Sequence, residues 1–223
     1  MKNRHLPLLL LAAALFGCND NSLVAITDRA VYSEFKVRYD KATNVTTGTA
    51  AFWEGSQNGR RLIFNGNATL LFQGVGMDYR GDDYTYVKEI QGAQAIAEFK
   101  ITDVNKKVFR DSISVNVAEY PFAMRLDTVD SSLPLTVAWT GSALENHETV
   151  TLRIGGVSAY QDTISRTSVT FPLSKFSQIS SLKGTKVTLV LERSKTIGLP
   201  SDLGGGGSIT AQYIAIAQTV YLK

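Results

Sequence analysis

The segment VYSEFKVRY, residues 31–39, alternates apolar and polar side chains along most of its length. Its apolar members Val31, Phe35, Val37 and Tyr39 would share one face of an extended chain, because successive side chains of a strand point to opposite sides. A period of two is typical of a strand that buries one face and exposes the other to solvent. The segment therefore predicts a half-buried β-strand, and the same pattern recurs towards the C-terminus.

Further strands are expected wherever this alternation or a short run of β-forming residues returns between Gly-rich and Asn-rich breaks. They are expected at residues 49–53, 61–64, 68–72, 85–90, 95–101, 109–117, 135–139, 150–154 and 187–191, with one bent or two short strands at 208–222. The segment TDVNKK, residues 102–107, combines Asp and Asn, which favour tight turns, and predicts a β-hairpin.

One segment has a different period. Between residues 173 and 184, apolar residues recur at every third position, which indicates one or two helical turns, 3₁₀ in part, joining two strands. We expect Ser174 to cap the start of this helix and Gly184 its end.

The pattern of strands is interrupted at Tyr120-Pro121, because proline donates no hydrogen bond to a sheet and holds the preceding residue extended. We predict an all-β protein with one β-sandwich at residues 30–119 and a second at residues 122–223. The hairpin at 103–107, which precedes a final alternating strand, is similar to the closing hairpin of an immunoglobulin-like domain. The segment LTVAW at 135–139 is similar to the buried tryptophan strand of such domains. The two halves thus resemble tandem immunoglobulin-like domains, as found in bacterial surface and periplasmic lipoproteins, and the resemblance implies an architecture only.

The N-terminus indicates export. Basic residues at positions 2 and 4 precede an apolar run of 11 residues, which is shorter than the ~20 needed to cross a bilayer and is typical of a cleaved signal peptide. The run ends in LFGC at residues 15–18, which is similar to the lipobox of bacterial lipoproteins. The resemblance implies a signal peptide at 1–17, a lipidated Cys18 that starts a tether at 18–29, and anchoring to a membrane of the bacterial cell envelope, with the outer membrane as the expected one. An ordinary secretory signal is the alternative.

Composition excludes several classes of function. Cleavage after residue 17 would leave 21 basic against 20 acidic residues. Since no basic stripe or block is present, we expect no binding to nucleic acid. Cys18 is the only cysteine, so the chain cannot form an internal disulfide, a cysteine-based metal site or a cysteine nucleophile elsewhere. We expect no cofactor.

Few residues of the sequence could support catalysis. Of the two histidines, His5 belongs to the signal peptide and His147 stands in the polar segment 142–148, which we expect to be a solvated loop. A serine triad needs a histidine base, and a zinc site needs three or four converging ligands. We therefore predict no catalytic residue, no metal site and no enzyme activity.

Aromatic and acidic residues are the better candidates for ligand contact. The segment DYRGDDY, residues 78–84, holds carboxylates that suit Ca²⁺, but its spacing does not fit an EF-hand and Arg80 brings a competing charge. The alternative is a turn solvated by its charges. Sugar rings stack on flat aromatic faces, so we add Trp53 and the nearby tyrosines to the candidate ligand contacts. For Trp53 the alternative is packing in the core. The candidate ligand-binding residues are Trp53, Asp78, Tyr79, Asp82, Asp83 and Tyr84.

The segment LGGGGS, residues 203–208, predicts a flexible connection before the last strands. It lacks the Lys-Ser/Thr ending of a phosphate-binding loop, so nucleotide binding is not expected.

These observations favour a non-catalytic binding or adhesion module whose partners are the membrane, through the lipid on Cys18, and a glycan or a protein ligand. The alternative is a structural or accessory subunit of a periplasm-facing envelope assembly, which would need an unpaired edge strand or a large exposed apolar patch.

Overall fold

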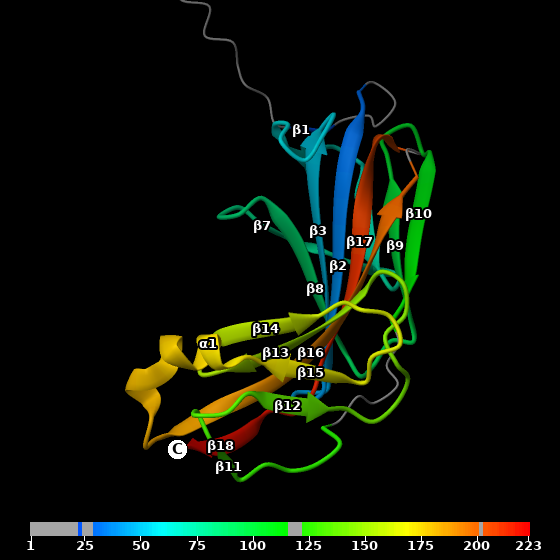
Figure 1. Ribbon diagram of the computed structural model, residues 1–223. Coiled ribbons are helices and arrows are strands. Elements are labelled where there is room, and N and C mark those ends of the chain that lie inside the picture. Colours follow the sequence, from blue (N-terminus) through cyan, green and yellow to red (C-terminus); the bar gives the residue numbers. More distant parts are fainter. Residues whose placement is uncertain (1–21, 24–28, 116–121, 201–202) are drawn as a thin grey trace, which may run out of the picture.

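The computed structural model describes residues 22–23, 29–115, 122–200 and 203–223 (Figure 1). The lipobox with Cys18 and the predicted break at Tyr120-Pro121 lie outside these residues. Within them the protein is all-β, as the alternating sequence predicts, and the helical residues are confined to one short segment.

The strands begin and end as follows: β1 (Ser22–Leu23), β2 (Val31–Asp40), β3 (Val45–Glu54), β4 (Arg61–Phe64), β5 (Thr69–Phe72), β6 (Val75–Gly76), β7 (Asp78–Arg80), β8 (Thr85–Gln91), β9 (Ile96–Thr102), β10 (Val108–Ser114), β11 (Thr128–Val129), β12 (Leu135–Ala138), β13 (Glu148–Ile154), β14 (Val157–Gln161), β15 (Ser168–Phe171), β16 (Lys186–Leu199), β17 (Gly204–Ile214) and β18 (Gln218–Leu222). The helical segment consists of α1 (Leu173–Phe176) and a 3₁₀ helix (Ser177–Leu182).

A 12-stranded sheet runs through the molecule in the order β1-β4-β3-β2-β17-β16-β13-β14, with β7, β8, β11 and β18 paired to its sides. In the upper part of Figure 1 this sheet stands beside a 4-stranded sheet of order β10-β9-β5-β6. In the lower part it is accompanied by the pair β12-β15. The upper and lower parts each bury a separate apolar cluster.

The upper core forms where the inward faces of β2 and β3 meet the second sheet. Phe35 on β2 stacks on Phe99 of β9 with ring centroids 4.5 Å apart and meets Phe52 of β3 edge-on at 5.9 Å. All three rings are almost fully buried. The alternation at residues 31–39 therefore places the apolar face as predicted: Val31, Phe35 and Val37 line the contact between the sheets, and Tyr39 is buried in the lower cluster.

The lower core collects the inward side chains of β13, β15 and β16 around Trp139, which is 4% exposed and lies in the core as expected. The helical segment closes one end, with Phe176 buried against Phe171 at a centroid distance of 4.8 Å. A short α-helical turn followed by a 3₁₀ helix confirms the predicted mixed helix. The expected cap is wrong: Pro172 occupies the N-cap position with no side-chain cap, and Ser174 lies inside the helix.

The long strands β16 and β17 contribute to both cores. Ile209 of β17 is buried in the upper cluster, while Leu189 of β16 and Tyr213 of β17 are buried in the lower one. The sequence prediction assigned all residues after 122 to a second sandwich. In the structure β17 instead lies between β2 and β16, parallel to β2, so the C-terminal part of the chain supplies a central strand to the upper sheet. A pair of tandem immunoglobulin-like domains is not confirmed.

The glycine run is not a loop, which corrects the prediction for residues 203–208. Gly204 begins β17, and the register along β2 shifts between Gly204 and Gly207. A Cβ on Gly205 would lie 2.5 Å from the carbonyl carbon of Val31, and a Cβ on Gly207 would lie 2.2 Å from the carbonyl oxygen of Ser33. Glycine is required here because the two backbones approach more closely than any side chain allows.

The predicted hairpin at 102–107 is confirmed as the connection between β9 and β10. Asp103, nearly fully buried, accepts a hydrogen bond from the backbone N–H of Lys107 at 2.9 Å. The left-handed residue is Lys106, with φ 66°, rather than Asn105. Six short strands have no counterpart in the sequence prediction, namely β1, β6, β7, β11, β14 and β15. Of the tether predicted at 18–29, Ser22–Leu23 forms β1 and pairs in parallel with β4.

Candidate functional site

The segment at 78–84, expected to be a loop, contains the edge strand β7, which pairs with β8. Tyr79 lies opposite Tyr86, while Asp78 lies opposite Val87. Because neighbouring residues of a strand face opposite sides, Tyr79 points to one side of the sheet and Asp78 to the other. The predicted ligand-binding residues of this segment are therefore divided between two surfaces.

A groove of about 380 Å³ opens on the side of Tyr79, between the ends of β4 and β5 and the β7–β8 hairpin. Tyr79 is 43% exposed, and its ring lies 5.2 Å from that of the buried Tyr86. The ring of Tyr86 lies 5.6 Å from that of Phe64, and the Tyr86 hydroxyl accepts a hydrogen bond from the Phe64 N–H at 2.7 Å. The groove is lined by Ile63, Phe64, Ala68, Thr69, Leu70, Leu71, Gly76, Met77, Tyr79 and Tyr86. We call this surface the Tyr79 groove.

The phenols of the Tyr79 groove stay protonated at neutral pH. Burial raises the pKa of Tyr86, although its hydrogen bond with the backbone of Phe64 opposes the rise. Desolvation also raises the pKa of Tyr79, and the nearby Tyr84 and Asp83 add to the rise. Both rings are thus uncharged aromatic surfaces whose hydroxyl groups can donate and accept hydrogen bonds.

The turn after β7 is ordered by Asp83. Its carboxylate accepts hydrogen bonds from the hydroxyl of Thr85 at 2.6 Å and from the N–H of Thr85 at 3.2 Å. The hydroxyl bond is the main reason why the pKa of Asp83 is lowered. Tyr84, which is 39% exposed, adopts φ 56° to complete the turn. Asp82, which precedes Asp83 in this turn, is exposed.

The acidic side chains do not converge as a calcium site requires. The carboxylate of Asp78 pairs with the ammonium group of Lys88 at 3.2 Å, and that of Asp83 is engaged by Thr85. Among the residues that the structure describes, no three His, Cys, Asp or Glu side chains form a group that could hold a metal ion. The hypothesis of bound Ca²⁺ gains no support from this arrangement.

Trp53 lies on a different surface from Tyr79. It is half-buried at the end of β3, where it pairs with Tyr32 of β2 and meets that ring edge-on at 5.8 Å. The guanidinium group of Arg61 lies 4.0 Å from the centre of the Trp53 ring. One face of the indole is therefore covered by a cation, which limits its use as a stacking platform.

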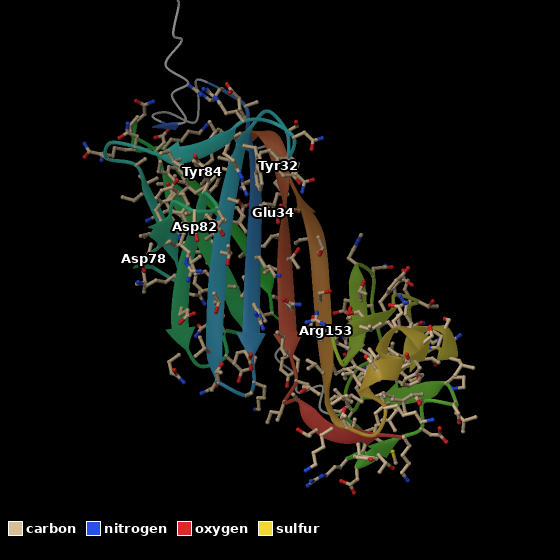
Figure 2. All side chains as sticks on the ribbon, turned by 90° about the vertical axis from the view of Figure 1, so that its left-hand side faces the viewer. Tyr32, Glu34, Asp78, Asp82, Tyr84 and Arg153 are labelled. Atoms are coloured by element: carbon tan, nitrogen blue, oxygen red, sulfur yellow. The ribbon has the colours of Figure 1, made fainter. Side chains whose placement is uncertain are left out.

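Tyr32 and Trp53 belong to the solvent side of the 12-stranded sheet, turned away from the second sheet. Figure 2 looks onto this side, with Tyr32 and Glu34 on the sheet, Asp78, Asp82 and Tyr84 towards one edge, and Arg153 near the lower part of the molecule. We define the outer face by residues that the registers place on this side: Tyr32, Glu34, Lys36, Arg38, Asp40, Thr47, Thr49, Trp53, Thr149, Thr151, Arg153, Ser158, Tyr160, Glu192, Ser194, Thr196, Ser208, Thr210 and Gln212.

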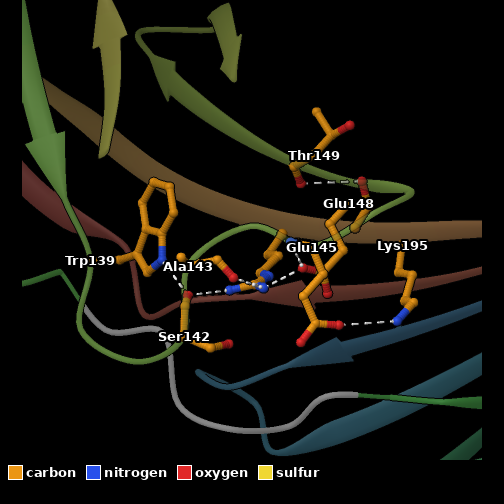
Figure 3. A network of polar contacts seen from close by, with 9 residues as sticks. Trp139, Ser142, Ala143, Glu145, Glu148, Thr149 and Lys195 are labelled. Atoms are coloured by element: carbon orange, nitrogen blue, oxygen red, sulfur yellow. Dashed lines mark hydrogen bonds and ion pairs between the residues drawn. The ribbon is translucent and has the colours of Figure 1, made fainter. Parts of the chain in front are cut away.

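The segment around His147 holds a buried polar network that the sequence analysis missed (Figure 3). His147 is exposed, but Glu148 is buried and forms an ion pair with Arg193 of β16. Arg193 also donates hydrogen bonds to the backbone carbonyls of Ser142 at 2.9 Å and Ala143 at 3.0 Å. The expectation of a wholly solvated loop at 142–148 is wrong, because these contacts dock the segment onto β16.

Further bonds extend this network at both ends. The Trp139 indole N–H donates to the Ser142 carbonyl at 3.1 Å, and the Glu145 N–H donates to the Glu148 carboxylate at 2.7 Å. Lys195 pairs with Glu145 at 3.6 Å on the surface. The network is a fixed scaffold rather than a reactive site, because its carboxylate is fully engaged by a guanidinium and a backbone donor.

The sequence analysis named Tyr79 and counted the tyrosines near it, Tyr86 among them, as an aromatic surface, but it missed Phe64 and the contact of Phe64 and Tyr86 with each other. Their strands were predicted at 61–64 and 85–90, so each residue was known to lie in a strand. What brings them to Tyr79 is the pairing of β7 with β8 and the approach of β4, neither of which a local sequence pattern predicts.

Within the described part of the chain, no helix is long and apolar enough to cross a membrane.

No family model and no curated protein matches this chain. Among solved structures, it is similar to SGBP-B of the Bacteroides ovatus mixed-linkage glucan utilization locus in complex with a mixed-linkage heptasaccharide, with 11% identity and a TM-score of 0.28 over 80% of this chain and 53% of that one. It is also similar to a 1.5-MDa bacterial ice-binding adhesin, with 15% identity and a TM-score of 0.23 over 87% of this chain and 65% of that one.

A third similar structure is the Ca²⁺-stabilized adhesin with which an Antarctic bacterium binds ice, with 11% identity and a TM-score of 0.29 over 86% of this chain and 49% of that one. The chain thus spans between about half and two thirds of the length of these structures. At such TM-scores the likeness carries no argument about function, which has to be made from the site itself.

Proposed function

We propose that this protein is a non-catalytic binding module of the bacterial cell envelope and that it holds a glycan in the Tyr79 groove. The observation that carries the proposal is the exposed ring of Tyr79 on the rim of a groove that also contains the rings of Phe64 and Tyr86. A pyranose ring has an apolar C–H face, which packs on aromatic rings, and a hydroxyl edge, which needs hydrogen-bonding partners. The groove offers both, because its rings carry two phenol groups beside an apolar floor.

The size and charge of the Tyr79 groove suit a neutral sugar. Its volume of about 380 Å³ lies within the ~300–1,000 Å³ typical of small-molecule sites. The residues that line it include no Asp, Glu, His, Lys or Arg. A groove without charged groups has nothing to pair with an acidic sugar, and it lacks the two carboxylates that most glycoside hydrolases use. Binding without turnover is the function that this lining supports.

The experiment that tests the groove measures binding of short neutral oligosaccharides by isothermal titration calorimetry, over a panel of linear glucans, mannans and xylans. We expect Tyr79→Ala to weaken the best ligand at least tenfold, which is about 1.4 kcal/mol. Tyr221→Ala is the matched control, because Tyr221 is 42% exposed and lies on β18 in the lower half. Equal affinities of the Tyr79 variant and the wild type would refute the groove as the site.

We also propose that Cys18 carries a lipid that anchors the protein to the outer membrane. The support is the sequence LFGC behind an 11-residue apolar run with basic residues before it. Two or more acyl chains give stable anchoring. Cells grown with a labelled fatty acid should label the wild type and not Cys18→Ser, and the variant should leave the membrane fraction. Label on the Cys18→Ser protein would contradict lipidation at this residue.

The second candidate function is a subunit of an envelope assembly. It is favoured by β14, which ends the order of the large sheet and, among the described strands, pairs only with β13. An open strand edge can pair with an extended segment of another protein. Crosslinking in intact cells tests this candidate: a single partner recovered in fixed proportion supports it, and recovery of the monomer alone counts against it.

A further inference from the structure

The outer face does not end with the upper half of the molecule. Through β16, whose N-terminal part pairs with β13 and whose C-terminal part pairs with β17, the sheet continues into the lower half. One rung runs from Arg38 through Gln212 and Ser194 to Thr149, each residue paired with the next across neighbouring strands. A single surface thus crosses from β2 to β13 and on to β14.

This surface forms an inside corner. In Figure 1 the second sheet, with β9 and β10, lies on one side of the upper strands, and the lower half with β14 and α1 projects towards the other side. That other side is the outer face, because the inward rings of β2 pack on β9. The upper strands and the projecting lower half therefore look onto the same space, and in Figure 2 Arg153 lies near the start of the lower half.

Polar contacts join side chains of β13, β16 and β17 on this surface. The Glu192 carboxylate, almost completely buried, accepts a hydrogen bond from the Gln212 amide at 3.0 Å and pairs with Arg153 at 3.2 Å. Above them, the hydroxyl groups of Thr196 and Thr210 are hydrogen-bonded at 2.9 Å across β16 and β17. These contacts fix the side chains in place, so a ligand that bonds to them orders little additional structure.

The side chains of the corner are neutral on balance and rich in hydroxyl groups. On its central strands, three basic residues, Lys36, Arg38 and Arg153, are matched by three acidic ones, Glu34, Asp40 and Glu192. Tyr160 on β14 is 70% exposed, whereas Tyr32 and Trp53, the other aromatic residues of the outer face, are half-buried and contact each other. Balanced charge gives no attraction for nucleic acid or an anionic membrane, and one exposed ring is not the apolar centre of a protein interface.

We propose that the inside corner is a second binding surface and that it takes an extended, neutral polysaccharide chain. Five strands from β2 to β14 span about 19 Å at a strand spacing of ~4.8 Å, a length that a polymer fills and a single sugar ring does not. The chain hydroxyls bond to the threonine hydroxyls and to the Gln212 amide, and one sugar ring stacks on Tyr160. The ligand class is shared with the proposed function, and this inference rests on it in that respect, but the residues are different.

The test compares soluble neutral polymers with their short oligosaccharides, using linear glucans, mannans and xylans, and polygalacturonate as the acidic counterpart. Polymer affinity is read from retardation in native gels that contain the polysaccharide, and oligosaccharide affinity from calorimetry. The corner variants are Tyr160→Ala and the double variant Thr196→Val/Thr210→Val. Their matched controls are Tyr221→Ala and Thr136→Val/Thr170→Val, since the hydroxyls of Thr136 and Thr170 also lie 2.9 Å apart across two exposed strand positions.

We expect each corner variant to weaken polymer binding at least tenfold while short oligosaccharides bind as to the wild type and polygalacturonate does not bind. The controls should match the wild type in both assays, and unchanged unfolding midpoints show that the variants are folded. Corner variants that bind polymer like the wild type would overturn this inference without affecting the proposal that the Tyr79 groove binds a glycan. Loss of polymer binding in the corner variants, together with normal oligosaccharide binding by Tyr79→Ala, would support the corner and refute the groove. Absence of binding to every neutral glycan would overturn both proposals.

Discussion

At the scale of single residues, the ion pair of Glu148 and Arg193 is buried in the lower half of the molecule. The side chains are 2% and 4% exposed, and Arg193 at the same time binds two backbone carbonyls. Burying such a pair in place of apolar residues gives little net stability, but removing one partner leaves an uncompensated buried charge. The pair therefore acts by holding the 142–148 segment in one position on β16.

Replacing one partner of this pair should be strongly destabilising. We expect Glu148→Gln to lower the free energy of unfolding by about 3–5 kcal/mol, because the Arg193 charge stays buried without its counter-ion. Urea unfolding followed by circular dichroism measures the change. Glu145→Gln is the control, since its pair with Lys195 is exposed and worth at most about 1 kcal/mol. Equal stabilities of the two variants would contradict the role assigned to Glu148.

A second prediction at this scale concerns pH and the turn beside the Tyr79 groove. The Thr85 hydroxyl lowers the folded-state pKa of Asp83 below its unfolded value, so the turn is stabilised above an unfolded pKa of about 3.9 and this contribution is lost as the pH falls through the folded pKa. Thr85→Val should return the pKa of Asp83 towards 3.9 in an NMR titration. Asp130, whose pKa the Ser132 hydroxyl lowers in the same way, should not change. An unaltered pKa of Asp83 in the variant would show that another contact sets it.

At the scale of elements, the start of β17 shows how glycine can mark a strand rather than a loop. The run at 204–207 lies against the β2 backbone, where Gly205 and Gly207 leave no room for a Cβ. In this position β17 can pair with β2 and continue to β16, so that the C-terminal part of the chain enters the upper sheet. The conformational freedom of glycine is here secondary to its lack of a side chain.

Adding one methyl group to this strand should therefore be costly. We expect Gly207→Ala to lower the free energy of unfolding by about 1–3 kcal/mol, the usual cost of overpacking. The added Cβ would clash with the backbone oxygen of Ser33, which cannot rotate away as a side chain can. Gly198→Ala is the control, because a Cβ there meets nothing within 4 Å although Gly198 pairs with the same strand. The difference in unfolding midpoint between the two variants is the measurement, and similar midpoints would contradict the close approach.

At the scale of the whole molecule, two apolar cores share three strands. Strands β2 and β17 supply buried side chains to both cores, and β16 supplies buried side chains to the lower core and partly buried ones to the upper core, so unfolding of one half would remove partners from the other. The expected behaviour is a single cooperative transition, in contrast to the independent transitions of two tandem domains.

The two tryptophans allow this to be measured, since Trp53 lies in the upper half and Trp139 in the lower core. In Trp53→Phe the remaining fluorescence reports on the lower half, and in Trp139→Phe it reports on the upper half. We expect the fluorescence midpoint in urea to coincide with the circular dichroism midpoint in each variant. Two separated midpoints within one variant would instead favour the pair of domains predicted from sequence.

The sequence by itself determined the strand content and the buried face of most strands. Phe35 and Val37 are buried, and Trp139 lies in a core, because a period of two assigns a side chain to a face without knowledge of its neighbours. The hairpin at 102–107 and the short mixed helix were also predicted from local signals, since the turn residues of the hairpin and the three-residue apolar period of the helix act within a few positions of the chain. Tyr79 could be named as an exposed aromatic on similar local grounds.

Only the tertiary structure decided which strands pair and which side chains meet. Nothing local in the glycine run places β17 beside β2, about 170 residues away in the chain, and nothing local in 142–148 reveals that Glu148 meets Arg193. The Tyr79 groove exists because β4 and β5 approach the β7–β8 hairpin, and the inside corner exists because one sheet extends through both halves. The physical reason is that a residue pattern encodes the face of a strand, whereas the pairing of distant strands depends on the free energy of the whole packed chain.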